Sequence, residues 1–187
     1  YRFDESSTEK AIAYAKIYAG TNYSPAMETV LKVAFSEKRN LPTFRLKSSD
    51  TILLSGYMKK WVGAYLAGYN NRPSVRTGNC SGTHPDPMAK TILRARISGL
   101  EDNLADKIVA RHSLLMTIEN NIGELLEEYL AVKLSPLGWY CCWGSTIDAV
   151  DFCKADGSLL QIKTSDNSEN SSSSRVRQGT PIGKWFR

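Results

Sequence analysis

The spacing of the hydrophobic residues changes once along this chain, next to Pro136 and Gly138. Before that point, residues such as Ile118, Ile122 and Leu125 recur at intervals of three or four, which places them on one face of a helix. After it, apolar and polar residues alternate with a period of two, which is typical of strands. The sequence therefore predicts a helical first part that is followed by a strand and a hairpin.

Local start and stop signals divide the helical part. Residues 7–20 end at a glycine, and residues 24–38 and 86–99 each open with a capping Ser or Asp and a proline at the first helical position. Residues 50–69 and 103–134 have helical spacing as well. The tyrosines and the tryptophan of residues 50–69 suit either a core or an interface, and we expect them in the core.

Three strands are expected in the second part of the chain. They cover residues 138–144, 145–154 and 158–165, and a turn at residues 155–157 joins the last two into a hairpin. A polar tail should follow the third strand.

Polar side chains converge on one face of this hairpin. Gln161 and Lys163 are two residues apart in the third strand, so both point away from the core that Leu160 and Ile162 should enter. With the predicted turn, Asp151 falls on the neighbouring strand within reach of Gln161 and Lys163.

This set of side chains can support hydrolysis of a phosphodiester. A carboxylate and an amide oxygen can hold Mg²⁺, which also binds phosphate oxygens. Lys163 beside such an ion could lower the pKa of an attacking water or stabilise charge on the phosphorus. The same residues also suit the solvent face of an amphipathic strand, so the spacing alone does not decide between the two interpretations.

The surrounding sequence is more specific. Residues 121–144 read NIGELLEEYLAVKLSPLGWYCCWG, and residues 149–180 read AVDFCKADGSLLQIKTSDNSENSSSSRVRQGT. Over about residues 118–187, the chain resembles the SinI family of type II restriction endonucleases, within the PD-(D/E)xK nuclease superfamily.

The resemblance implies a fold and a division of the chain. The fold would be α/β (α+β), with a PD-(D/E)xK restriction-endonuclease-like core in which helices flank a mixed sheet, preceded by a largely helical N-terminal region. Residues 1–100 would then clamp DNA or form a dimer. Residues 101–187 would hold the catalytic core and the DNA-recognition segment, and the core could continue beyond residue 187.

The resemblance also assigns roles to the hairpin residues. Asp151 matches the metal-binding acid, Gln161 the middle position of the motif and a second metal ligand, and Lys163 its catalytic lysine. Gln161 replaces the usual Glu or Asp, so one negative charge is missing. Asp148 is a rival for the acid, since some relatives place the acid thirteen residues before the middle position. Asp148 and Asp151 would face opposite sides of a regular strand, and we favour Asp151.

Many members of the superfamily add a glutamate from the preceding helix. Glu127 is our candidate for this catalytic acid, and Glu119, Glu124 and Glu128 remain alternatives. Glu127 lies beyond the edge of the apolar stripe, where a helix glutamate is commonly a solvated surface residue.

The segment after Lys163 is expected to contact DNA. Read alone, its serines would suit a disordered polar linker. Behind a catalytic lysine, its hydroxyls and amides can bond phosphate oxygens, while Arg175 and Arg177 either read guanine edges or contact phosphates only. The predicted DNA-binding residues are Asn167, Asn170, Ser171, Ser172, Ser173, Ser174, Arg175, Arg177 and Lys184.

The charge distribution agrees with a DNA partner. The net charge is +5, and residues 163–187 hold five basic residues against two acidic ones. No apolar run approaches the ~20 residues of a membrane span, and the first residues lack the pattern of a signal peptide, so we expect a cytoplasmic protein without a membrane partner. The four cysteines and two histidines lack paired metal-binding spacing, which argues against a zinc site.

The function that the resemblance implies is Mg²⁺-dependent cleavage of double-stranded DNA at a short palindrome, GG(A/T)CC for this family. Cutting both strands of a palindrome implies a homodimer with two-fold symmetry. Two other functions remain open. A structure-selective repair nuclease of the same superfamily would lose the sequence preference, and a non-catalytic DNA-binding protein would have lost its metal site at Gln161.

Overall fold

A computed structural model describes residues 3, 5–44, 53–76, 87–163 and 181–186 of the chain. The chain forms two compact units, of which the first comprises Tyr1–Arg72 and Glu127–Arg187 and the second comprises Pro73–Leu126. In the described part of the chain, no helix combines the length and the apolar character that a membrane span needs.

The helices follow the start and stop signals of the sequence. They are α1 (Thr8–Ala19), α2 (Pro25–Ser36), α3 (Leu54–Asn70), α4 (Pro87–Arg96) and α5 (Asp102–Leu134), with short 3₁₀ turns at Glu5–Ser7, Gly20–Asn22, Lys38–Asn40 and Ser135–Leu137. At the start of α2, the Ser24 hydroxyl accepts the Met27 N–H at 3.2 Å, as expected for a cap. All the predicted helical segments are confirmed where the structure describes them, with residues 50–52 and Asp86 outside the described residues.

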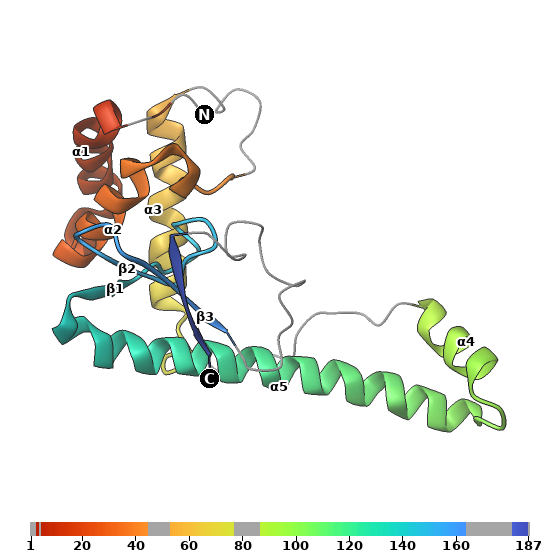
Figure 1. Ribbon diagram of the computed structural model, residues 1–187. Coiled ribbons are helices and arrows are strands. Elements are labelled where there is room, and N and C mark those ends of the chain that lie inside the picture. Colours follow the sequence, from red (N-terminus) through yellow and green to blue (C-terminus); the bar gives the residue numbers. More distant parts are fainter. Residues whose placement is uncertain (1–2, 4, 45–52, 77–86, 164–180, 187) are drawn as a thin grey trace. The chain divides into compact units, whose positions relative to one another are not determined.

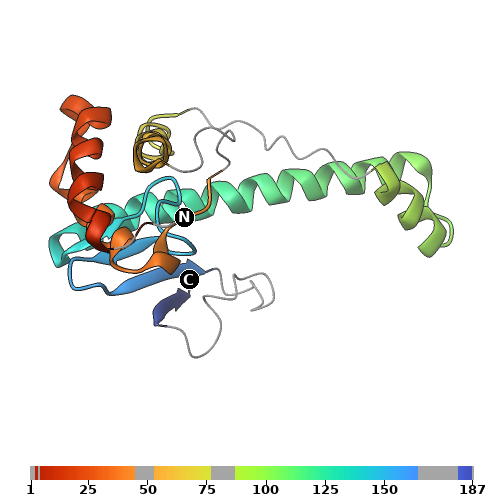
Figure 2. The same ribbon diagram turned by 90° about the horizontal axis from the view of Figure 1, so that it is seen from above.

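The strands form one mixed sheet in the order β1, β2, β3, β4. β1 (Trp139–Cys141), β2 (Phe152–Lys154) and β3 (Leu159–Lys163) are antiparallel neighbours, and β4 (Ile182–Phe186) lies parallel to β3. Figure 2 shows β4 as the dark blue strand at the edge of the sheet. The predicted α/β architecture, a mixed sheet with a mostly helical N-terminal region, is therefore confirmed.

Two features of the sheet differ from the prediction. The second strand was expected over residues 145–154, but only Phe152–Lys154 is a strand. Ser145 and Ala149 have positive φ angles of 54° and 59°, which bend the backbone out of the extended conformation. Strand β4 was not predicted, because its parallel partner β3 lies across a long connection.

The hydrophobic core of the first unit lies between α1, α2, α3 and the sheet (Figure 1). Helix α1 packs along α3, and α2 contacts β1 and β2. Tyr57, Trp61 and Tyr65 of α3 are buried in this core. The expectation that the aromatic residues of this helix belong to the core is thus confirmed for these three, whereas Tyr69 near the end of α3 is 45% exposed.

The segment between β1 and β2, residues 142–151, is anchored on α3. The backbones of Gly68 and Gly144 approach so closely that a Cβ atom at either glycine would collide with backbone atoms of the opposing segment. Trp61 Nε1 donates a buried hydrogen bond to the Thr146 carbonyl at 2.9 Å. Because both contacts come from one rigid helix, they fix the path of the chain just before β2.

Ion pairs join the helices of the second unit. Lys90 and Arg94 of α4 bind Asp106 and Asp102 of α5, each at 2.8 Å. These acids lie four residues apart, so α4 packs on a single side of α5.

Alanine substitutions at two glycines of α3 test the close approach. We expect Gly68→Ala to destabilise the protein by about 1 to 3 kcal/mol, because its methyl group would overpack the contact with Gly144. Gly63 has open space at its Cβ position, so Gly63→Ala should stabilise the helix by up to ~1 kcal/mol through propensity. Urea unfolding of both variants measures the two effects, and equal stabilisation by both would contradict the contact.

Candidate active site

Asp151 stands at the end of the anchored segment, directly before β2. Its backbone N–H donates to the Leu160 carbonyl at 3.0 Å. Its carboxylate oxygen Oδ2 accepts the backbone N–H of Ile162 at 2.7 Å. The carboxylate therefore takes the hydrogen bond that the backbone of a longer β2 would have accepted, and it is held next to the middle of β3.

Gln161 lies at the centre of a row of polar residues that crosses the sheet. Asp151 falls opposite it when the register of β2 and β3 is continued by one residue. Lys184 is its partner on the other side, in β4. Because partners in neighbouring strands share a face, Gln161, Lys184 and Lys163, two positions along β3, occupy one face of the sheet. Asp151 lies just outside β2 and reaches the middle of β3 through the Ile162 N–H.

The burial of β3 corrects the orientation that the sequence suggested. Leu159 belongs to the main hydrophobic core, whereas Leu160 and Ile162, which were expected there, are half-buried and lie outside it. Leu159 shares its face with Gln161 and Lys163. The polar side chains thus continue along the face of β3 that points to the core. This explains why the side-chain oxygen of Gln161 is buried.

Among the described residues, the side-chain oxygen of Gln161 has no hydrogen-bond partner although it is buried. A buried acceptor without a partner typically costs about 1 to 3 kcal/mol of folding free energy. A ligand that bonds this oxygen would remove that cost. Gln161 and the Asp151 carboxylate together offer an amide oxygen and a carboxylate. Mg²⁺ accepts such a set because it binds few protein oxygens and keeps several waters. Among the described residues, no group of three or more His, Cys, Asp or Glu side chains could hold a metal.

The charge of Asp151 is influenced by its surroundings. Burial raises the pKa of Asp151 above the usual 3.8, while the Ile162 N–H and the positive charge of Lys163 act in the opposite direction. Lys163 is therefore close enough to Asp151 to interact with it electrostatically. The three hairpin residues singled out in the sequence are brought together by the fold.

Cys141 lies near both Glu127 and Asp151. Cys141 is a buried free thiol. Burial raises the pKa of Cys141, and the charges of Glu127 and Asp151 raise it further. Both carboxylates thus lie near the same thiol within the first unit, so the structure brings Glu127 into the neighbourhood of Asp151.

The alternative glutamates have other surroundings. Glu128 pairs with Arg72 at 3.3 Å, and Glu124 pairs with Arg76. Glu119 is exposed on the part of α5 that belongs to the second unit. Of these candidates, the geometry favours Glu127.

Asp148, the alternative acid, is positioned differently from Asp151. Its backbone N–H donates to the Asn40 carbonyl at 2.9 Å, within the bent segment before β2. Because this segment is not a strand, the alternation that argued against Asp148 does not apply. The preference for Asp151 rests instead on its direct hydrogen bond to β3.

Most of the predicted DNA-binding residues lie outside the described part of the chain. They are Asn167, Asn170, Ser171, Ser172, Ser173, Ser174, Arg175 and Arg177. Lys184 is described, and β4 places it beside Gln161. The pairing of Lys184 with Gln161 could not be predicted, because the alternation of apolar and polar residues in residues 182–186 is too short to indicate a strand or its partner.

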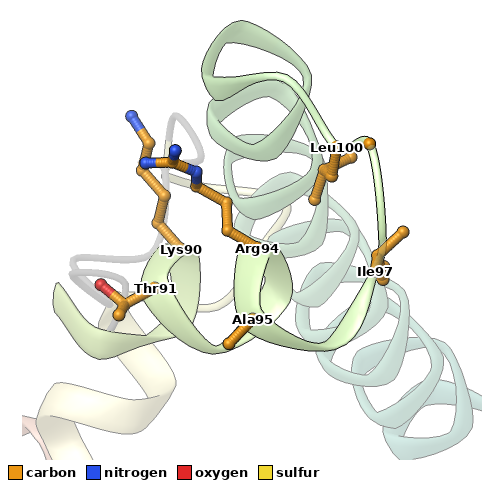
Figure 3. A pocket seen from close by; sticks show the side chains of 7 residues that line it. Lys90, Thr91, Arg94, Ala95, Ile97 and Leu100 are labelled. Carbon is orange, nitrogen blue, oxygen red and sulfur yellow. The ribbon is translucent and has the colours of Figure 1, made fainter.

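A pocket of about 470 Å³ lies in the second unit, formed by α4 and the turn that follows it. Figure 3 shows Lys90 and Arg94 pointing together to one side of it, with Ile97 and Leu100 at the far end. Both cations are paired with acids of α5. None of the predicted catalytic residues lines this pocket, so it carries no part of the proposed chemistry.

Known proteins match a large part of this chain. The family model described as SinI restriction endonuclease matches residues 48–187. The type II restriction enzymes SinI of Salmonella infantis and Eco47I of Escherichia coli are each 46% identical to it over 110 residues, which are 56% of this chain and 47% of either relative. The chain thus spans about half the length of these curated relatives. The matched family region contains Asp151, Gln161 and Lys163 and begins well before residue 118.

The raised pKa of Asp151 predicts a pH-dependent effect of its removal. The folded protein binds the proton of Asp151 more tightly than the unfolded chain does, so ionising this carboxyl costs stability. The cost is absent below the unfolded value of 3.8, grows as the pH rises, and is complete above the raised pKa. Asp151→Asn should therefore raise the midpoint of thermal unfolding at neutral pH and leave it nearly unchanged at about pH 3.

Asp156 in the hairpin turn is the matched control. The Ser158 N–H donates to its carboxylate at 2.9 Å and lowers the pKa of Asp156. Asp156→Asn should therefore lower the midpoint at neutral pH and lose this effect as the pH falls through the lowered pKa. Changes of the same sign in both variants would contradict the burial of Asp151.

Proposed function

The chain belongs to the SinI restriction endonuclease family, and on this premise we propose that it hydrolyses phosphodiester bonds in double-stranded DNA at a short palindrome, as a type II restriction endonuclease. The observation that carries the proposal is the convergence of Asp151, Gln161 and Lys163 at the middle of β3, inside the region that matches the family. The proposed target is of the GG(A/T)CC type.

Mg²⁺ is the proposed cofactor, with Asp151 and Gln161 as its protein ligands. Two features support this assignment: the buried Gln161 oxygen has no partner in the described part of the chain, and burial disfavours the charge of Asp151. A cation between the two groups would relieve both penalties. When bound, Mg²⁺ makes a water more acidic and neutralises phosphate charge.

The cations of the site act on the phosphate. Lys163, close to Asp151, stabilises the negative charge that grows on the phosphorus oxygens as the bond breaks. Lys184, beside Gln161, contacts a phosphate of the bound DNA. Glu127 supplies a second carboxylate, which orients the attacking water.

A type II restriction endonuclease must also recognise a base sequence and act on both strands. Arg175 and Arg177 are the proposed readers of guanine, because arginine bonds the major-groove edge of guanine with two donors. A homodimer would present one site to each strand of a palindrome. The proposed place of action is the cytoplasm, with double-stranded DNA as partner.

One observation favours a second candidate, a DNA-binding protein without catalytic activity. Gln161 stands where the family resemblance calls for an acid, and a chain that had lost its metal site could look the same. In that case DNA binding would be indifferent to Mg²⁺. The proximity of Lys163 to a half-buried Asp151 argues for the enzyme, because the acid of a mere surface strand would be exposed.

Cleavage of a plasmid of known sequence tests the proposal. With Mg²⁺ we expect discrete fragments whose ends share one palindrome, and with EDTA no cleavage. Lys163→Ala should lower the cleavage rate at least about a hundredfold while DNA binding survives, because its charge is needed mainly in the transition state. The matched control is Lys154→Ala, since this lysine of β2 lies over the Trp139 ring at 5.0 Å and should leave the rate unchanged.

The other outcomes separate the alternatives. Fragments with random ends would indicate a structure-selective nuclease of the same superfamily. An uncut plasmid that still shifts on a gel would indicate the protein that only binds DNA.

Restoring the missing charge gives a further prediction. Gln161→Glu places a second carboxylate beside Asp151, so the variant should unfold at a lower temperature than the parent without divalent ions. Mg²⁺ should then raise the unfolding midpoint more in the variant, and roughly tenfold less Mg²⁺ should be needed for half-maximal cleavage, because ligand charge sets cation affinity. Titration with NaCl at equal ionic strength is the control. An identical Mg²⁺ response in both proteins would exclude residue 161 as a ligand.

A further inference from the structure

The part of α5 in the second unit carries a regular row of exposed apolar side chains. Counted together with Arg111, they recur at alternating intervals of four and three residues. Each of the six is between 36% and 57% exposed, although large aliphatic side chains are usually buried. They are Leu104, Ile108, Leu115, Ile118, Ile122 and Leu125, and we call this row the α5 seam.

The spacing of the α5 seam is that of a coiled coil. Alternating steps of four and three keep a row of residues facing one partner helix over several turns. Helix α4 does not occupy this face, because its ion pairs go to Asp102 and Asp106, which lie off the seam. The seam is therefore an apolar face suited to a second helix with the same spacing.

We propose that the α5 seam binds the α5 seam of a second copy of this chain, with the two helices antiparallel about a two-fold axis level with residues 116 and 117. In this register, Ile108 faces Leu125 of the second copy, and Leu115 faces its Ile118. Each pairing occurs twice by symmetry, as an isologous contact requires. The seam is apolar on both sides of its centre, so it is complementary to itself.

Arg111 determines the direction of the pairing. In a parallel, in-register pair, two Arg111 side chains would meet inside the seam, and their like charges would repel. In the antiparallel register, Arg111 lies opposite Ile122 of the second copy and next to its Glu119, which is exposed. Two such contacts between opposite charges arise by symmetry, and they favour a second copy as the occupant.

Only the biological role of this dimer rests on the proposed function. A two-fold dimer would have the same symmetry as a DNA palindrome. The spacing, exposure and charges of the seam do not depend on whether the chain cuts DNA.

Charge reversal tests the pairing in the full chain. Arg111→Glu and Glu119→Arg should each weaken the dimer about tenfold or more, because each brings like charges together. The variant with both substitutions should regain the affinity of the parent. Residues 111 and 119 are about 12 Å apart along one helix, so they cannot pair within it, and recovery requires a second copy. Sedimentation velocity over a range of protein concentrations measures the dissociation constant.

Apolar substitutions provide the matched control. Leu115→Glu, near the centre of the seam, should give a monomer. Ile92→Glu on α4 should leave the dimer intact, because this residue is 56% exposed but lies off the seam. A parent chain that is monomeric at all concentrations, or a double variant as weak as the single ones, would overturn the proposal.

The failure of this inference is distinguishable from the failure of the proposed function. If seam variants cut DNA as fast as the parent and the parent is a monomer, the nuclease stands and the seam pairing is wrong. If charge reversal dissociates and restores a dimer that cleaves no DNA, the seam pairing stands and the nuclease is wrong.

Discussion

The contact between α3 and the segment before β2 determines where an active site can form. Gly68 and Gly144 let two backbones meet, and the bond from Trp61 to Thr146 fixes the same segment a second time. As a result the chain enters β2 only after Asp151, whose carboxylate, rather than a backbone carbonyl, bonds the Ile162 N–H. The position of the acid is thus set by packing at the helix and by pairing at the strand.

The site that results carries costs that packing alone does not explain. Burial works against the charge of Asp151, and the Gln161 oxygen is buried without a partner among the residues that the structure describes. A structural role would be served better by apolar side chains of similar size, since buried polar groups rarely gain stability. Costs of this kind concentrate at functional sites, where a ligand offsets them.

The sequence predicted the elements whose signals are local. Caps and spacing identified the helices, and the two-residue step from Gln161 to Lys163 placed both side chains on one face. It could not predict the short β2, because Ser145 and Ala149 adopt positive φ angles without the glycine that normally marks them. β3 has apolar residues on both faces, so alternation could not show that Leu159 rather than Leu160 enters the core. Lys184 reached the site only through parallel pairing across a long connection, for which no local signal exists.

The amide at position 161 affects how the proposed enzyme would hold its metal. An acid there would repel Asp151, whose pKa is already raised, and would favour a shared proton over two charges. In the proposed enzyme, Gln161 would keep the ligand oxygen without this repulsion, and Lys163 and Lys184 lie on the same face, so the protein alone would attract a cation only weakly. The phosphate of bound DNA would supply the missing negative charge and further oxygen ligands. Metal binding and DNA binding would then reinforce each other, as thermodynamic linkage requires of two ligands that share contacts.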